Sequence, residues 1–525
     1  MEDWVQALRT AKVNYMKDHF SLDEQVRRQF EDTSTLTEFS TSKSSDKLRA
    51  YVMATQRARK VNAIASKFDI LSFSHSPLSS GVAKYSVVPD SSDNILYYES
   101  PEGKDTNIKG GTVDKLIEKL SDPSVTDIRY IMAFLLTYRS FTTPAYLLDL
   151  LIQIFNYYSV AHRKKGKGSD TPATENTIHI RVGLVLKKWL ECHFYDFVED
   201  LELTNKLLAF IDNMKNERRK QSAFNIKSEN KHDDNELLKT AMVLKGAIKK
   251  NVFPKNKALV SEQYLQNAPA LILPTLFNKN AFDFIDLDPL EIARQLCILE
   301  FELFHKVTPK EFLNQRWNKS QKEKEAPNIY AIIKRFNQFS FWVSSVIVKV
   351  KDVKPRAAMI KKFIDIAQHC LELNNLTSTM EICAGLESSG IFRLRKTWQL
   401  LPPETTSKFE AMKVALGSEK NYKAYRETLR KATGPCVPYM GVFLQDLTFI
   451  EDGNPDFVKG TELVNFEKRV MVSKVISEIQ LFQQLPYCLL PQEDIQRFFL
   501  TVEPLSQDDI FALSQQCEPR ARLNE

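Results

Sequence analysis

The chain has 525 residues, of which 43% are hydrophobic and only 15 are glycine. This length predicts two to four domains with enough apolar side chains for folded cores, and the scarcity of glycine argues against a loop-rich or β-rich protein. The formal net charge of +6 is too small for a nucleic-acid-binding class, so we predict no nucleic-acid partner.

Both ends of the chain and its cysteines predict a cytoplasmic protein. The N-terminal sequence MEDWVQALRT lacks the charged-then-apolar order of a signal peptide, and no apolar run reaches transmembrane length. The C-terminal sequence RARLNE carries no prenylation box. Seven cysteines without a CxxC pair are typical of reduced cytosolic thiols. Firm membrane contact would therefore depend on a partner.

The motifs of bond-making enzymes are missing from the sequence. It contains no GxxxxGK[ST] phosphate loop, no GxGxxG, no HExxH, no GxSxG and no kinase signature. The eight histidines are scattered, whereas metal sites need clustered ligands. We therefore predict no cofactor, no metal and no covalent catalysis.

Residues 1–100 contain nothing that indicates chemistry. The spacing of apolar and basic residues predicts a helix with a basic face within 51–68. Further on, the β-prone runs AKYSVV and ILYYES flank a PDSSDN turn, which predicts a short β-hairpin near 82–100.

From Gly110 onward the pattern is helical. One stripe of apolar residues marks a first helix, Asp122-Pro123 begins a second, and Thr142-Thr143-Pro144 begins a third. Short loops between helices predict an α-bundle that continues to about Asn216. The charged segment that follows predicts a solvated linker with connecting helices over 217–276.

The last part of the chain also predicts helices. Asp288 is placed to cap a helix with Pro289 in its first turn, and Glu291 completes a pattern close to a capping box. Further helices are expected to begin near six positions, and together with the earlier helices they predict a mostly α fold. These positions are Ile329, Arg356, Thr379, Thr406, Asn421 and Thr461.

A helical hairpin is predicted near the C-terminal end. Prolines lead into the apolar run Gly441–Ile450, which ends at Glu451-Asp452 and a Gly-Asn-Pro turn. The segment Thr461–Leu485 then repeats apolar residues at intervals of three and four. This pattern predicts a helix, a tight solvated acidic turn and a second helix. An ordinary core hairpin is the alternative that the pattern alone leaves open.

The sequence of this hairpin is VPYMGVFLQDLTFIEDGNPD followed by LVNFEKR. It resembles the helical hairpin of the Ras-type guanine-nucleotide exchange factors, the family of Son of sevenless. The phrases DPLEIARQL, IKRFNQFSFWV, GLESSGIFRLRKTW and NYKAYRETL resemble the catalytic domain of that family, and GGTVDKLIEKL with FLLTYRSFTTPAYLLDLL resembles its Ras exchanger motif. The resemblance implies an exchanger motif over 108–216, a linker over 217–276 and an all-α catalytic domain with a protruding hairpin over 285–520. Residues 1–100 stay unassigned.

The resemblance implies that the chain stimulates GDP release, and so GTP loading, on a Ras-family small GTPase. The chain itself would make or break no covalent bond. Ras or Rap is the expected partner, and membrane contact, at the inner face of the plasma membrane or elsewhere, would be indirect through the lipidated GTPase. A GTPase-binding scaffold of the same fold without exchange activity is the alternative. An unrelated α-helical scaffold would require all of these motifs to coincide by chance.

The resemblance also implies which residues bind the GTPase. Polar groups that hold its switch II region are expected at Lys334 and Asn337, and in the loop with Glu387 and Ser389. Glu387 departs from the asparagine that is usual in the family, and Phe392 nearby is expected in the core. Two tyrosines complete the set. Tyr422 is expected to contact switch II, and Tyr439, at the base of the hairpin, is expected either to contact switch II or to anchor the hairpin.

Within the hairpin, the resemblance implies that Gln445, Thr448 and Asp452 form the surface that enters the nucleotide site. Thr448 would disturb the surroundings of magnesium. Asp452, where many members have Glu, would offer its carboxylate to the lysine of the phosphate-binding loop, with Glu451 sharing or replacing that role. Three residues are expected to support the hairpin: Leu447, Asn465 and Arg469.

Overall fold

The computed structural model describes residues 85–98, 107–125, 127–164, 172–223, 241–248, 262–274 and 282–519, without the side chains of 159–164, 172–176 and 215–223. The chain divides into two units, Met1–Ser72 and Phe73–Glu525, and every described residue belongs to the second. The predictions for residues 1–84 and for most of the linker 217–276 therefore lie outside the described residues.

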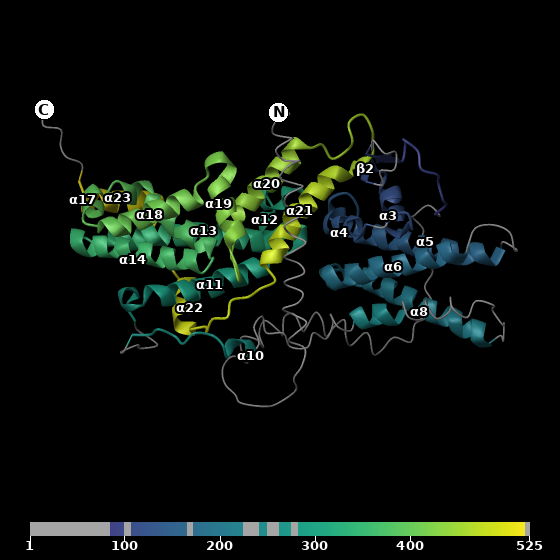
Figure 1. Cartoon of the computed structure of the whole chain (residues 1–525), viewed down its shortest axis with the longest axis horizontal. Helices are drawn as coiled ribbons and strands as arrows, with labels where there is room; N and C mark the ends of the chain where they lie inside the picture. The colour runs from purple at the N-terminus through teal and green to yellow at the C-terminus, as the bar shows by residue number, and fades with distance from the viewer. Residues whose placement is uncertain are drawn as a thin grey trace. The chain divides into compact units, whose positions relative to one another are not determined.

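The first part of the described chain is a helical bundle (Figure 1). Thr112 and Asp127 cap two of its helices, each by accepting a hydrogen bond from a backbone N–H of the first turn. Apolar residues from every helix with described side chains fill its core. The helices are α3 (Val113–Ser121), α4 (Ile128–Thr137), η1 (Tyr138–Ser140), α5 (Pro144–Lys164), α6 (Pro172–Cys192), α7 (Tyr195–Glu199) and α8 (Leu201–Ala223).

The second part begins with short pieces, a helical stretch at 241–248, α10 (Glu262–Leu265) and η2 (Phe284–Asp286). Helices of 4 to 23 residues then follow one another to the end of the described chain. They are α11 (Pro289–His305), η3 (Pro309–Asn318), α12 (Lys322–Glu325), α13 (Pro327–Lys349), α14 (Val353–Glu372), α15 (Leu376–Glu387), α16 (Ser389–Phe392), α17 (Arg395–Gln399), α18 (Pro403–Leu416), α19 (Glu419–Lys431), α20 (Met440–Gly453), α21 (Phe466–Phe482), α22 (Glu493–Leu500) and α23 (Gln507–Cys517). The prediction of a mostly α fold is confirmed.

Two apolar cores fill this second part. One lies among α11, α13, α14 and α15 and includes Trp342 and Phe363. The other lies beneath α20, α21 and η3 and includes Phe443 and Leu447. Leu136 of α4 belongs to the second core. The helical bundle therefore contributes to the core beneath the hairpin helices through Leu136.

The predicted β-hairpin near 82–100 is wrong in its pairing. Residues 85–90 form no strand, and Val87 and Val88 are exposed. Instead β1 (Ile95–Tyr97) pairs antiparallel with β2 (Ile108–Gly111), which pairs antiparallel with β3 (Val464–Asn465). A Cβ added at Gly110 would lie 2.7 Å from the Val464 carbonyl oxygen, so glycine permits this close approach. The sheet ties the bundle to the start of α21.

Several predicted helix starts shift by a few residues. The helix expected from Thr461 begins at Phe466, because the Asn465 side chain caps it. Asp288 caps α11 as predicted, but the capping box is wrong. Glu291 instead turns inward, where its Oε1 accepts a hydrogen bond from Gln295 Nε2 at 2.7 Å.

His193, at the junction of α6 and α7, predicts a pH dependence of stability. Burial lowers the pKa of its imidazole to about 4, with Asp196 opposing and Arg139 adding to the shift. Below pH of about 6.5 the unfolded chain therefore binds a proton that the folded chain does not, and stability falls with pH until about pH 4. We expect wild type to lose about 1.4 kcal/mol more than His193→Gln between pH 7.5 and 5.5, measured by urea unfolding. Equal losses in both proteins would contradict this assignment.

The described part of the chain lacks both a membrane-spanning helix and a cluster of metal-ligating side chains. None of the described helices combines the length and apolarity needed to cross a membrane. No group of three or more His, Cys, Asp or Glu side chains suited to a metal ion lies in the described part of the chain.

Candidate functional site

The hairpin helices α20 and α21 pack side by side (Figure 1). The inner face of α20 is apolar, with Phe443 and Leu447 fully enclosed. Gln445, Thr448 and Asp452 recur at intervals of three and four and so share the opposite face. Gln445 and Thr448 are half-buried, and Asp452 is exposed. The structure therefore groups three of the predicted tip residues on one outward face of α20.

Phe449 was missed by the sequence analysis. It lies next to Thr448 on α20, and 52% of its surface is exposed. An exposed aromatic side chain beside the predicted tip residues is a candidate contact for a partner protein, because aromatic residues are enriched at interfaces. The apolar run that predicted the helix gave no sign of which of its members would face outward.

The two acids at the end of α20 have different surroundings. Glu451 forms an ion pair with Lys468 of α21, Oε2 to Nζ at 2.6 Å, and the two side chains are only 9% and 3% exposed. Asp452 instead accepts a hydrogen bond from Gln315 Nε2 at 2.8 Å. The predicted solvated acidic turn is therefore wrong for Glu451, which is enclosed in the hairpin, whereas Asp452 faces solvent.

Lys468 is the centre of an ionic cluster that sequence reasoning missed. Its Nζ also lies 2.9 Å from Asp456 Oδ1, which in turn lies 2.8 Å from Arg469 Nη2. Burial raises the pKa of Asp456, but Lys468 and Arg469 outweigh it and hold that pKa below its usual range. These contacts close the loop between α20 and α21.

Two other residues were predicted to support the hairpin: Asn465 lies at the end of this loop, and Leu447 lies within α20. The Asn465 side chain accepts a hydrogen bond from Lys468 N at 3.2 Å and donates one to the Pro455 carbonyl oxygen at 3.0 Å. Leu447 is completely buried beneath α20. Asn465 therefore fixes the end of the loop before α21, and Leu447 belongs to the apolar core beneath the hairpin.

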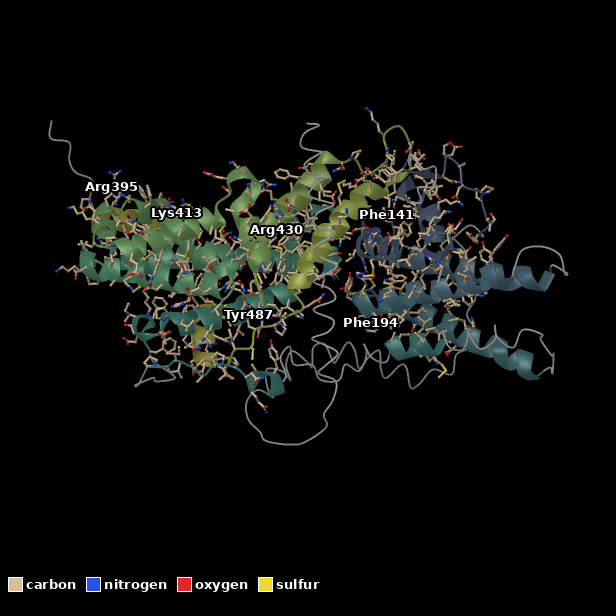
Figure 2. The ribbon with its side chains drawn as sticks, in the orientation of Figure 1. Phe141, Phe194, Arg395, Lys413, Arg430 and Tyr487 are labelled. Carbon is tan, nitrogen blue, oxygen red and sulfur yellow. The ribbon has the colours of Figure 1, made fainter. Side chains whose placement is uncertain are left out.

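The helical bundle contacts α21 through aromatic rings. Phe466 lies 4.9 Å from Tyr130 and 6.4 Å from Phe134 between ring centroids. The Arg469 guanidinium lies 5.9 Å from the centre of the Phe141 ring, which lies beside α21 in Figure 2. The bundle therefore supports the base of the hairpin directly.

A second ionic link fixes the outer side of the hairpin. Arg426 of α19 forms a bidentate pair with Asp446 of α20, with both N–O distances at 2.8 Å. Burial raises the pKa of the Glu478 carboxyl of α21 to about 6. Of the two charges in this pair, Arg426 lowers that pKa and Asp446 raises it. Bidentate pairs fix orientation as well as distance. The link therefore fixes the position of α20 relative to α19.

One exposed face of α13 carries both polar and apolar side chains. Lys334, Asn337 and Phe341 are all exposed and lie at intervals of three and four. Phe336 points to a different side of the same helix and packs against Tyr439, with the ring centroids 5.1 Å apart. Lys334 and Asn337 therefore share one exposed face of α13, whereas Tyr439 packs against another side of that helix.

Glu387 and Ser389 are exposed at the end of α15 and the start of α16. Glu387 Oε1 lies 3.6 Å from Lys413 Nζ of α18. Beside this pair, Val414 is 72% exposed, and Phe392 is 68% exposed. The expectation of a core Phe392 is therefore wrong, because α16 is a single short turn that leaves its last residue outside.

Tyr422 lies in an unusual turn rather than in a regular helix. It is half-buried and is the last of three consecutive residues with positive φ, at 57°. Its ring lies 6.2 Å from that of Tyr425, whose hydroxyl accepts a hydrogen bond from Tyr439 N at 2.7 Å. This contact brings Tyr422 and Tyr439 to the same end of the hairpin.

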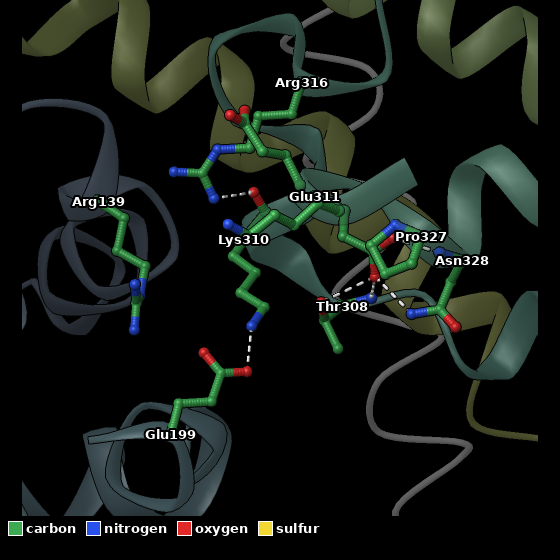
Figure 3. Close-up of a pocket in the computed structure, with 10 residues that line it drawn as sticks. Arg139, Glu199, Thr308, Lys310, Glu311, Arg316, Pro327 and Asn328 are labelled. Atoms are coloured by element: carbon green, nitrogen blue, oxygen red, sulfur yellow. Dashed lines mark hydrogen bonds and ion pairs between the residues drawn. The ribbon is translucent and has the colours of Figure 1, made fainter. Parts of the chain in front are cut away.

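A cavity of about 400 Å³ lies between the helical bundle and η3 (Figure 3). Arg139 and Glu199 line it from the bundle, and Lys310 and Arg316 line it from η3. Lys310 pairs with Glu199 across it, and Arg316 Nη1 donates to the Lys310 carbonyl oxygen at 3.0 Å. The charged groups that line the cavity therefore pair largely with one another. The Lys310–Glu199 ion pair links the helical bundle to η3.

Comparison with known domain families identifies both parts. Residues 291–470 match the RasGEF domain, and residues 107–210 match the RasGEF N-terminal motif. The chain therefore belongs to the proteins that carry a RasGEF domain behind a RasGEF N-terminal motif.

The chain is similar in sequence to several curated proteins. Ras guanine nucleotide exchange factor P of Dictyostelium discoideum is 35% identical over 446 residues, which cover 82% of this chain and 27% of that protein. Protein son of sevenless of Drosophila melanogaster is 32% identical over 466 residues, covering 82% and 28%. Ras guanine nucleotide exchange factor A of Dictyostelium discoideum is 37% identical over 413 residues, covering 77% and 63%. The chain thus spans less than two thirds of the length of each of these relatives.

Proposed function

We propose that this chain is a guanine-nucleotide exchange factor for a Ras-family small GTPase. The observation that carries the proposal is the outward face of α20, where Asp452 is exposed. Ion pairs join α20 to α21 and to α19, so this face is presented by a fixed helix. The RasGEF domain and the names of the relatives support the same activity.

The exchange itself follows from thermodynamic linkage. A nucleotide bound on the order of pM is held by about 16 kcal/mol, so spontaneous release is slow. A protein that binds the nucleotide-free GTPase more tightly than the nucleotide-bound form weakens nucleotide binding by the same factor. No bond is made or broken, and none of the described residues needs to act as a nucleophile.

We assign the two faces different parts of this task. The face of α13 with Lys334 and Asn337 would hold the switch II region, and Tyr439 and Tyr422 would contact it from the base of the hairpin. The loop with Glu387 and Ser389 would extend the same contact.

The face of α20 would enter the nucleotide site. Thr448 and Gln445 would occupy the space near magnesium. Asp452 would offer a substitute anion to the lysine that otherwise holds the phosphates. Since Glu451 is paired with Lys468, we assign it to hairpin support rather than to this contact. The linker and residues 1–100 have no assigned part.

Ras or Rap is the expected partner branch. Membrane contact, at the inner face of the plasma membrane or at another membrane, would be indirect and made through the lipid anchor of the GTPase.

Complex formation with nucleotide-free GTPases tests the proposal. Purified Ras, Rap and Ral, stripped of nucleotide, are mixed with the chain and separated by gel filtration. We expect a stable complex with one branch, which excess GDP or GTP with Mg²⁺ dissociates, because nucleotide and exchanger compete by linkage. A complex that survives excess nucleotide would instead indicate the scaffold alternative, and the absence of any complex would overturn the proposal.

A further inference from the structure

The best candidate for a further functional residue is Gln315, which lies in η3 and contacts the tip of the hairpin. Its Nε2 donates a hydrogen bond to Asp452 Oδ1 at 2.8 Å, across 137 residues of sequence. Asp452 Oδ2 makes no hydrogen bond with any other described residue. One oxygen of the carboxylate is therefore held by Gln315, while the other faces solvent and is available to a partner.

The backbone at this point adopts an unfavourable conformation. Asn314 and Gln315 have φ of 55° and 51°, in the left-handed region that residues with a Cβ avoid. Such conformations persist only where the surroundings impose them, and they cluster at functional sites. Here the flanking side chains Phe312, Leu313 and Trp317 are all buried, so the turn is anchored on both sides.

The anchored turn sets the direction of the Gln315 side chain. Because η3 packs against α20 and Arg316 bonds back to Lys310, the carboxamide is presented to the hairpin by a rigid support. A hydrogen bond to one carboxylate oxygen restricts the rotation of the side chain without using its second oxygen. The Asp452 carboxylate is thus already oriented before a partner binds. This lowers the entropic cost of ordering the side chain on binding.

We propose that Gln315 is a positioning residue that orients the Asp452 carboxylate for its contact with the lysine of the GTPase phosphate-binding loop. This inference rests on the proposed function. It deepens that function, because it makes the reach of Asp452 depend on a second element of the fold.

The test compares rates of GDP release from the responsive GTPase at increasing GTPase concentration. We expect Gln315→Ala and Gln315→Gly to lower the maximal rate about threefold to tenfold, with little change in the GTPase concentration that gives half of that rate. Glycine tolerates positive φ, so it separates the loss of the side chain from strain in the backbone. Asn318→Ala, a matched exposed carboxamide in the same segment, should leave the rate unchanged.

Two further variants give results that a merely structural role would not. Gln315→Glu places a like charge opposite Asp452, so it should lose more activity, and added salt should reduce that loss. In an Asp452→Ala background, Gln315→Ala should cause no further loss, because the two residues act through one contact.

Each opposing outcome has a distinct meaning. A wild-type rate in Gln315→Gly, or equal losses with and without Asp452, would overturn the positioning role alone. If wild type accelerated no GTPase, or if Asp452→Ala exchanged at the wild-type rate, the proposed function or its acidic contact would fail, and the positioning role would fail with it.

Discussion

Replacing Asp452 with alanine is expected to slow GDP release from the responsive GTPase by about 100-fold. The carboxylate is exposed and, among the described residues, is held only by Gln315. Its loss would therefore remove the anion offered to the phosphate-loop lysine, and removing one such group from a charge-stabilising site costs about 10²-fold or more. Because the side chain is solvated, the denaturant midpoint should not change. Stopped-flow release of fluorescent GDP and urea unfolding measure the two effects.

Two control variants sharpen this prediction. Asp452→Glu keeps the charge and adds one methylene, so it should retain exchange. Glu462→Ala removes an exposed acid from the loop that follows α20 and should have no effect. An Asp452→Ala variant that exchanged at the wild-type rate would show that the hairpin acts without this carboxylate.

Replacing Lys468 with methionine is expected to destabilise the hairpin and thereby to slow nucleotide exchange. The ammonium group is 3% exposed and faces both Glu451 and Asp456. Removing one partner of a buried ion pair leaves an uncompensated charge and costs about 3 kcal/mol. The substitution should lower the free energy of unfolding by roughly that amount and reduce exchange, because α20 and α21 would no longer be joined at this loop.

A second substitution separates charge from packing at this site. Adding Glu451→Gln to Lys468→Met removes the stranded carboxylate, so the double variant should recover part of the lost stability. Lys408→Met, which breaks the exposed pair with Glu404, should have no measurable effect. If Lys468→Met were as stable as wild type, the cluster would not hold the hairpin.

The regular parts of the fold could be predicted from local patterns. Apolar residues at intervals of three and four predict the stripes of α3, α11 and α21, and Asp288 indicates the start of α11. These features depend on neighbours within one or two turns, so sequence spacing contains the necessary information.

Contacts between distant segments could not be predicted in the same way. The pattern paired β1 with the residues before it, across the PDSSDN turn, whereas its partner β2 follows it in the chain. Gln315 meets Asp452 across 137 residues. Likewise, Glu451 and Asp452 look equivalent as a pair, yet successive residues on a helix point about 100° apart. Only packing against α21 decides which of the two acids is enclosed with Lys468.

The most direct test of the account is release of fluorescent GDP from purified Ras, Rap, Ral and Rho proteins, with and without this chain, in excess unlabelled GTP. We predict acceleration that is confined to one Ras-family branch, that saturates with the chain, and that is lost in Asp452→Ala. Unchanged release from every GTPase, by a chain whose unfolding is cooperative, would contradict the central claim that this hairpin opens a nucleotide site.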